Sequence, residues 1–183
     1  MAGGGEASLA APDAAYEQVD KILHAWEAIV PTETVGASDE RISKLIIRTS
    51  AHAKLHWSRE QRLHFLDSLM ATQAVYRESI QRMGNAYGFN KSEDPEVLQR
   101  WCQLLVRHNC QDFAPVIEGY LGARGDDRAS LVVWQAIVEK GRQEMRWKFI
   151  AQDTWRSLKA RLSPDISAEV EGILDSGNCL RPF

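Results

Sequence analysis

The sequence lacks the features that would place it in a membrane or on nucleic acid. An α-helix needs about 20 apolar residues to cross a bilayer, and no apolar run in this sequence approaches that length. The 22 lysines and arginines are balanced by 25 acidic residues, and the net charge of -3 gives no general attraction for phosphates. The first eleven residues also lack the basic start and apolar centre of a secretory signal. We therefore expect no membrane or nucleic-acid partner, and a flexible arm over residues 1–12.

Cysteine is scarce, with only Cys102, Cys110 and Cys179 in 183 residues. An odd number without paired spacing is typical of free thiols in a reducing compartment. Cys102 lies in an apolar helical pattern, and His108 is six residues away, which is not a spacing that makes neighbours on a helix. We predict a cytoplasmic protein in which Cys102 is a buried apolar residue rather than a nucleophile.

Catalytic motifs are missing as well. The segment HAKLHW places His52 and His56 four residues apart, but a helical zinc peptidase motif needs a glutamate where Ala53 stands. Ser58 and Gln61 form a capping-box pattern, which predicts a helix start after His56 and leaves both histidines in a loop or extended segment. No nucleophile elbow, phosphate-binding glycine loop or dinucleotide fingerprint occurs. We expect no catalytic residue, metal or cofactor in this chain.

Helical periodicity is present almost throughout, whereas strand-like alternation is scarce. The segment ISKLIIRTS, residues 42–50, is the ambiguous one, because its apolar centre fits a helix or an extended segment. Short connections between helices favour antiparallel neighbours, as in a HEAT- or armadillo-like stack. We predict an all-α superhelix of about eight helices, forming one domain over residues 13–176 with a tail over 177–183. The expected helices cover residues 13–30, 58–70, 76–87, 94–109, 112–123, 127–140, 142–162 and 165–174.

Two charged segments are candidates for binding. KGRQEMRWKF, residues 140–149, interleaves basic residues with Trp147, a pattern found in single-strand binders, but a solvated helix face is the favoured interpretation. GARGDDR, residues 122–128, lies between two expected helices. Its glycine and aspartates could simply end one helix and start the next. Alternatively, its exposed charges face a partner or substrate at the end of a stack.

A family resemblance follows from the order of several segments. SIQRMGNAYGFN, EVLQRWCQLLVRHNCQDFAPVIEGYLGARG and SREQRLHFLDSL resemble the C-terminal helical domain of the leukotriene-A4 hydrolase and aminopeptidase B type of zinc metallopeptidases. The resemblance extends from about Tyr16 to Leu174. It implies an α-α superhelix packed beside a separate thermolysin-like domain, which would hold the zinc and the glycine-rich exopeptidase motif. The chain would then be non-catalytic and would shape the substrate cleft of a catalytic metallopeptidase domain, in cis or in another protein.

The same resemblance suggests a binding role for two arginines. In the family, an Arg-x-Lys after the helix-ending glycine anchors the substrate carboxylate. After Gly125 this chain has Asp126, Asp127 and Arg128, so the second cation is kept and the first is reversed. A leukotriene-type acid is therefore disfavoured, because an aspartate repels a carboxylate. Arg128 and the neighbouring Arg124 become candidate contacts for a peptide terminus. A free-standing helical-repeat scaffold that binds protein is the alternative hypothesis.

Overall fold

A computed structural model describes residues 12–29, 37–72 and 74–179. The predicted arm over residues 1–12 lies almost entirely outside this range, and its last residue already belongs to the first helix. The described part is all-helical and contains no strand, as predicted. Its α-helices are α1 (Pro12–Glu27), α2 (Ala37–His56), α3 (Arg59–Ala71), α4 (Arg77–Ala86), α5 (Pro95–Arg107), α6 (Ala114–Arg124), α7 (Leu131–Gly141), α8 (Met145–Leu158) and α9 (Pro164–Ser176). Four 3₁₀ turns accompany them: η1 (Phe89–Lys91), η2 (Gln111–Phe113), η3 (Arg128–Ser130) and η4 (Lys159–Arg161).

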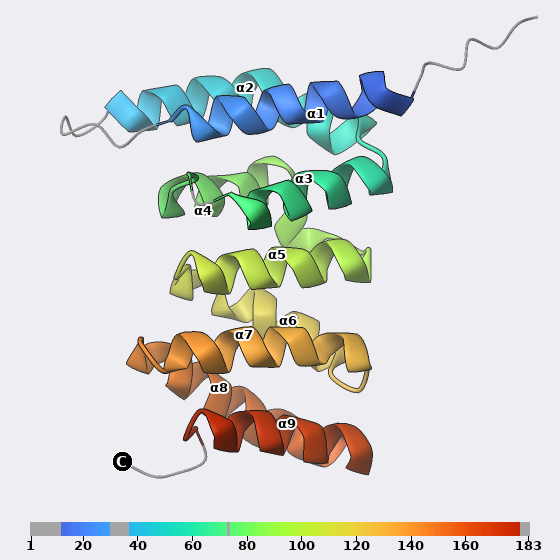
Figure 1. Cartoon of the computed structure of the whole chain (residues 1–183), viewed down its shortest axis with the longest axis vertical. Helices are drawn as coiled ribbons and strands as arrows, with labels where there is room; N and C mark the ends of the chain where they lie inside the picture. Colours follow the sequence, from blue (N-terminus) through green and yellow to red (C-terminus); the bar gives the residue numbers. More distant parts are fainter. Residues whose placement is uncertain (1–11, 30–36, 73, 180–183) are drawn as a thin grey trace, which may run out of the picture.

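The helices form a two-layer stack (Figure 1). The odd-numbered helices α1, α3, α5, α7 and α9 pack one after another in the front layer, and the even-numbered helices lie behind them. Because successive helices are antiparallel, all odd-numbered helices begin at the same edge, on the right of Figure 1. The turns that connect an even helix to the next odd helix therefore gather at that edge. We call it the turn edge.

Local sequence signals fix the starts of α3 and α5. Ser58 and Gln61 form the predicted capping box, with Gln61 N 3.2 Å from Ser58 Oγ and Ser58 N 2.8 Å from Gln61 Oε1. Asp94 caps α5 by accepting hydrogen bonds from the backbone N–H groups of Glu96 and Val97, and Pro95 occupies the first turn. These caps satisfy helix-end donors that would otherwise lack partners.

The ambiguous segment 42–50 is helical, and the prediction that His52 and His56 lie in a loop is wrong. Both histidines belong to α2, whose last residue is His56. The capping box at Ser58 starts α3 directly afterwards, so the prediction placed the start of α3 correctly and missed the helix before it. The reason is that Ile47 and Leu55 of α2 are 77% and 76% exposed, which obscures the period of its buried face. The described residues therefore contain nine α-helices instead of about eight.

Two helices in the same layer end in the same way. At the end of α5, Cys110 N donates to Leu105 O, and Asn109 adopts a left-handed conformation with φ 57°. At the end of α9, Cys179 N donates to Leu174 O, and Asn178 has φ 53°. This is the Schellman arrangement with asparagine in place of the usual glycine. It turns each cysteine inward, and both are fully buried.

An aromatic cluster fills the core beneath the first two turns of the turn edge. Trp57, which follows α2, packs on Phe65 of α3 with ring centroids 4.9 Å apart. Tyr87 and Phe89, after α4, extend the cluster to Trp101 of α5. Aromatic pairs at such distances contribute beyond their buried area. The cluster gives the turns above it a rigid base.

Candidate functional site: the turn edge

The predicted site residues lie on the third turn of the turn edge, between α6 and α7. Arg124 is the last residue of α6, and Arg128 begins η3 ahead of α7. A Cβ at Gly125 would lie 2.3 Å from the backbone oxygen of Leu121 and 3.1 Å from Leu162 Cδ2, so this position favours glycine. Arg124, Asp126, Asp127 and Arg128 line a hollow of about 400 Å³. The structure thus brings the two predicted arginines together at one exposed depression.

Each charge in this hollow has a partner. Arg124 Nη2 lies 2.9 Å from Asp127 Oδ2, and the other oxygen of Asp127 caps η3 by accepting from Ala129 N. Arg128 forms an ion pair with Glu169 of α9. All these side chains are exposed to a substantial degree, so the ion pairs contribute little stability and can exchange for another anion.

Asp126 connects this turn to the next one. Its Oδ1 accepts a hydrogen bond from Ser163 N, the residue before α9, at 2.6 Å. Hydrogen bonds from the hydroxyl and backbone N–H of Ser163 hold the pKa of Asp126 below its ordinary value. Asp126 therefore stays ionised beside the two arginines, which keeps negative charge in the hollow.

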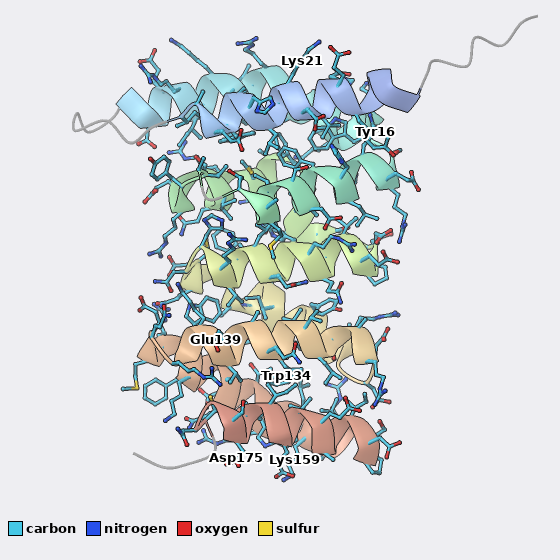
Figure 2. All side chains as sticks on the ribbon, in the orientation of Figure 1. Tyr16, Lys21, Trp134, Glu139, Lys159 and Asp175 are labelled. Atoms are coloured by element: carbon cyan, nitrogen blue, oxygen red, sulfur yellow. The ribbon has the colours of Figure 1, made fainter. Side chains whose placement is uncertain are left out.

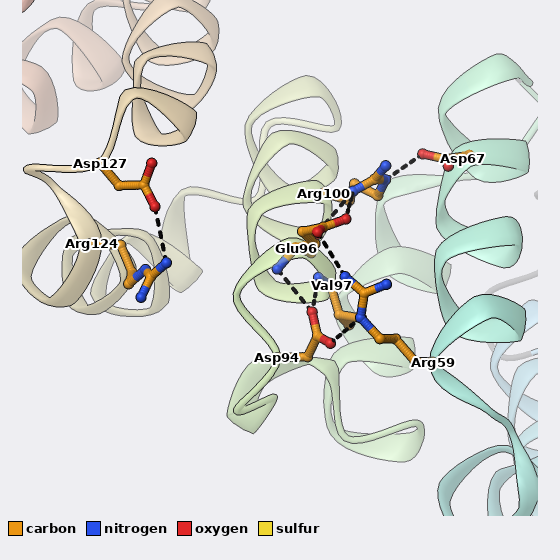
Figure 3. A network of polar contacts seen from close by, with 8 residues as sticks. All are labelled: Arg59, Asp67, Asp94, Glu96, Val97, Arg100, Arg124 and Asp127. Atoms are coloured by element: carbon orange, nitrogen blue, oxygen red, sulfur yellow. Dashed lines mark hydrogen bonds and ion pairs between the residues drawn. The ribbon is translucent and has the colours of Figure 1, made fainter.

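A network of ion pairs extends along the turn edge toward α3 (Figure 3). Arg59 at the start of α3 lies 2.7 Å from both Asp94 and Glu96 of the α5 start. Arg100, one turn further along α5, approaches Glu96 and, at 2.6 Å, Asp67 of α3. These contacts connect the start and the middle of α3 to the first two turns of α5. Figure 3 shows Arg124 and Asp127 as a separate pair on the next turn.

A second hollow of about 430 Å³ lies beside this network, and no pattern in the sequence predicts it. Lys54 of α2, Arg62 of α3 and Lys91 of η1 line it together with Gly88. Arg62 donates to the carbonyl oxygens of Ala53 and Lys54 at the end of α2, and burial lowers its pKa. These residues are too far apart in the sequence, and too ordinary in type, to form a recognisable motif.

His52 and His56 lie on one face of α2, contrary to the prediction that they lie in a loop or extended segment. The rings of His52 and His56 are 5.2 Å apart on one face of the helix. Among the residues that the structure describes, however, no group of three or more histidine, cysteine, aspartate or glutamate side chains could hold a metal ion. A pair alone gives only part of a metal coordination shell. The expectation that this chain holds no metal therefore stays a prediction.

The basic segment 140–149 does not present its tryptophan. Trp147 is fully buried, and its Nε1 donates to Asn109 Oδ1 at 2.7 Å. Arg142 forms an ion pair with Glu139. A tryptophan in this position cannot stack on a base, so the single-strand binding interpretation loses its main support. The favoured interpretation of this segment is a solvated helix face, and Trp147 points away from that face into the core.

All three cysteines are free and buried. Burial raises the pKa of the Cys102 thiol and raises the pKa of Cys110 to about 12. A thiol that stays protonated is a poor nucleophile. Among residues 12–29, 37–72 and 74–179, none of the helices combines the length and the hydropathy that a membrane-spanning segment requires.

The fold therefore defines an all-α stacked-helix protein with a charged edge. Residues 57–174 match the family described as leukotriene A4 hydrolase, C-terminal, and the chain belongs to this family. The chain is 22% identical to aminopeptidase B of Mus musculus and 21% identical to aminopeptidase B of Rattus norvegicus, in each case over 119 residues. Each match covers 64% of this chain and 18% of the relative, so the chain corresponds to less than a fifth of the relatives' length. No solved structure matches the chain.

Proposed function

We propose that this chain is the C-terminal helical domain of a zinc aminopeptidase-like protein and shapes the substrate cleft of a separate catalytic domain. The observation that carries the proposal is the family match over residues 57–174. The turn edge is the surface that faces the cleft in this proposal, since it collects loops and charged side chains on a rigid helical base. The catalytic domain belongs to the same polypeptide or to another protein.

Arg124 and Arg128 contact the carboxylate of a peptide substrate in this proposal. Both arginines line the hollow of the third turn, and their present partners, Asp127 and Glu169, are exposed carboxylates. A substrate carboxylate can replace an exposed partner at little cost, because such ion pairs are weak. Asp126 opposes any carboxylate in this hollow, that of a peptide included, and the two arginines supply the attraction that outweighs it. The proposed substrate is a peptide because the matched relatives are aminopeptidases.

Zinc would be bound by the catalytic domain and would activate water there. This chain's own residues would contribute binding and orientation of the substrate. The charged side chains that line the two hollows of the turn edge are arginines, lysines and carboxylates at helix ends and in the turns between them, which suits positioning rather than bond cleavage.

The decisive experiment isolates the natural protein with an antibody against this chain. The isolate is tested for aminoacyl-amide hydrolysis and zinc content, and the size of the reactive polypeptide is compared with 20.6 kDa. We expect zinc and hydrolysis to copurify, either in a larger polypeptide or with a second one, and the purified 183-residue chain to be inactive. Hydrolysis by the purified chain with stoichiometric zinc would refute the assignment of catalysis to another domain.

A free-standing scaffold is the second candidate function, and one observation favours it. Ile47 and Leu55 of α2 are the most exposed large apolar side chains among the described residues. Exposed apolar side chains on one helix face are typical of protein contacts. An isolate without zinc, hydrolysis or a metallopeptidase polypeptide would favour this second function.

A further inference from the structure

One face of α2 is apolar and turned outward at the end of the stack. Ile47, Ala51 and Leu55 are spaced by four residues, which places them in one stripe on the helix. All three are exposed, and the two large side chains are 77% and 76% exposed. The buried face of α2 lies on the opposite side, where Leu45 and Thr49 point toward the core. No other described helix lies beyond α2 at this end (Figure 1).

Positive charge surrounds this stripe. Arg41, Lys44, Arg48 and Lys54 lie on α2, against Asp39 and Glu40. Lys44 pairs with Glu40, whereas Arg41, Arg48 and Lys54 form no ion pair with another described residue. Terminal helices of a stack usually present a polar outer face. The combination of an apolar stripe with unpaired cations is therefore a surface that fits an acidic helix.

The opposite end of the same chain carries such a helix. α9 contains Asp165, Glu169, Glu171 and Asp175 and has no lysine or arginine. Glu169 and Glu171 pair with Arg128 and Lys159, but Asp165 and Asp175 form no ion pair with another described residue. Figure 2 shows Asp175 and Lys159 at the end of the stack opposite Lys21 of α1.

The outer face of α9 also has little side-chain bulk. Ala168 and Gly172 are exposed and separated by four residues, and a Cβ added at Gly172 would meet no atom within 4 Å. Small residues allow a second helix to approach closely, and bulky side chains such as Ile47 and Leu55 can then pack over them. The two ends thus match in shape and in charge.

We propose that the outer face of α2 binds α9 of a second copy of this chain, so that copies associate head to tail. The contact is heterologous, because it joins two different surfaces, and each pair keeps one free α2 face and one free α9 face. The assembly therefore grows with concentration and does not stop at a dimer. This proposal does not rest on the proposed function, and its test needs no enzymatic activity.

The first test measures the weight-average mass of the full 183-residue chain by light scattering, from about 10 μM to about 1 mM, where a weak protein contact is half-saturated. We expect a mass that rises above 20.6 kDa with concentration without levelling off at twice that value, and that falls when salt is added. A constant mass of one chain would overturn the proposal. So would a plateau at the dimer, which indicates a symmetric contact.

Matched variants identify the surfaces. The double variant Ile47→Ser/Leu55→Ser should weaken association at least about tenfold, which corresponds to the loss of two apolar anchors. The control Val132→Ser removes an apolar side chain that is 38% exposed on α7, and it should associate like the wild type. Circular dichroism checks that each variant is folded. Equal effects of the two changes would contradict the assignment to α2.

A charge exchange tests the head-to-tail arrangement. Arg41→Glu/Arg48→Glu reverses the α2 face, and Asp165→Lys/Asp175→Lys reverses the α9 face, so each variant alone should stay monomeric. An equimolar mixture should associate again, because every reversed face then finds a complementary one. If the mixture stays monomeric while the wild type associates, charge complementarity between α2 and α9 is refuted.

Discussion

The indole Nε1 of Trp26 donates a hydrogen bond to the hydroxyl of Tyr87. The two atoms are 2.7 Å apart, and the two residues are 61 positions apart in the sequence. The Tyr87 oxygen also lies 2.6 Å from Thr49 Oγ1, and Thr49 Oγ1 donates to Leu45 O. Because the single hydroxyl hydrogen of Thr49 is used in this bond, Tyr87 donates to Thr49. The hydrogen bonds thus run from Trp26 to Tyr87, from Tyr87 to Thr49 and from Thr49 to the backbone oxygen of Leu45. This buried relay ties α1 and α2, which precede the family-matched segment 57–174, to the end of α4.

Replacing Tyr87 with phenylalanine should destabilise the fold. The change leaves the indole N–H of Trp26 buried without an acceptor, which costs about 1–3 kcal/mol. Urea unfolding followed by circular dichroism measures the loss. The control is Tyr76→Phe, which removes a hydroxyl from a tyrosine that is 38% exposed and should change the free energy of unfolding by much less. Equal losses in the two variants would show that the relay contributes nothing.

The two Schellman asparagines make a matched pair for a second prediction. Asn109→Ala and Asn178→Ala both put alanine in the left-handed region, where it lacks the local hydrogen bonds by which an asparagine side chain tolerates this conformation. Each change should cost about 1 kcal/mol. Asn109→Ala also removes the acceptor for the buried Trp147 Nε1, so its loss should be larger by about 1–2 kcal/mol. Thermal and urea unfolding give the difference. If Asn178→Ala is the more damaging change, the hydrogen bond to Trp147 is not the deciding contact.

Asp94 should make stability depend on pH. Burial would raise its pKa, but hydrogen bonds from Val97 N, Arg59 and Glu96 N outweigh burial and hold the pKa below the ordinary 3.8. A carboxyl whose pKa is lowered by folding contributes stability above its unfolded pKa, and this contribution is lost as the pH falls through the lower folded value. The free energy of unfolding should thus fall below about pH 4 more steeply in the wild type than in Asp94→Asn, which retains a capping residue.

Glu93→Gln is the control for this pH profile. Glu93 is the exposed neighbour of Asp94 and caps no helix. Its replacement should leave the acid limb of the stability curve as steep as in the wild type. A wild-type curve that superimposes on that of Asp94→Asn would contradict the role assigned to the cap.

Arg124→Ala and Arg128→Ala test the substrate contact without disturbing the fold. Each arginine makes an exposed ion pair, so each replacement should cost less than about 1 kcal/mol of stability. In the proposed assembly with a catalytic domain, we expect the double variant to raise KM for short peptides about tenfold, while KM for aminoacyl amides, which have no terminal carboxylate, stays unchanged. Arg142→Ala, which breaks an exposed pair with Glu139 at the end of α7, on the edge of the stack opposite the turn edge, is the control. Unchanged peptide KM in the double variant would contradict the role.

Local signals in the sequence are sufficient to predict the positions of most helices. The caps at Ser58 and Asp94 and the left-handed Gly88, with φ 78°, fix helix starts and ends through short-range hydrogen bonds and sterics. α2 escaped prediction because Ile47 and Leu55, both apolar and both exposed, blur its period. A periodicity argument assumes that apolar side chains face inward, and it fails where they face outward.

The sequence by itself determined the class of the protein: an all-helical chain, its family, and the two candidate arginines on a turn between helices. Only the tertiary structure decided that this turn lies at one edge with three others, that Trp147 faces inward, and that the histidines of α2 share a helix face. The physical reason is the distance along the sequence over which each kind of interaction acts. Caps, turns and periodicity act over a few residues. The turn edge, and the placement of α2 and α9 at opposite ends of the stack, arise instead from antiparallel packing of helices that are distant in the sequence.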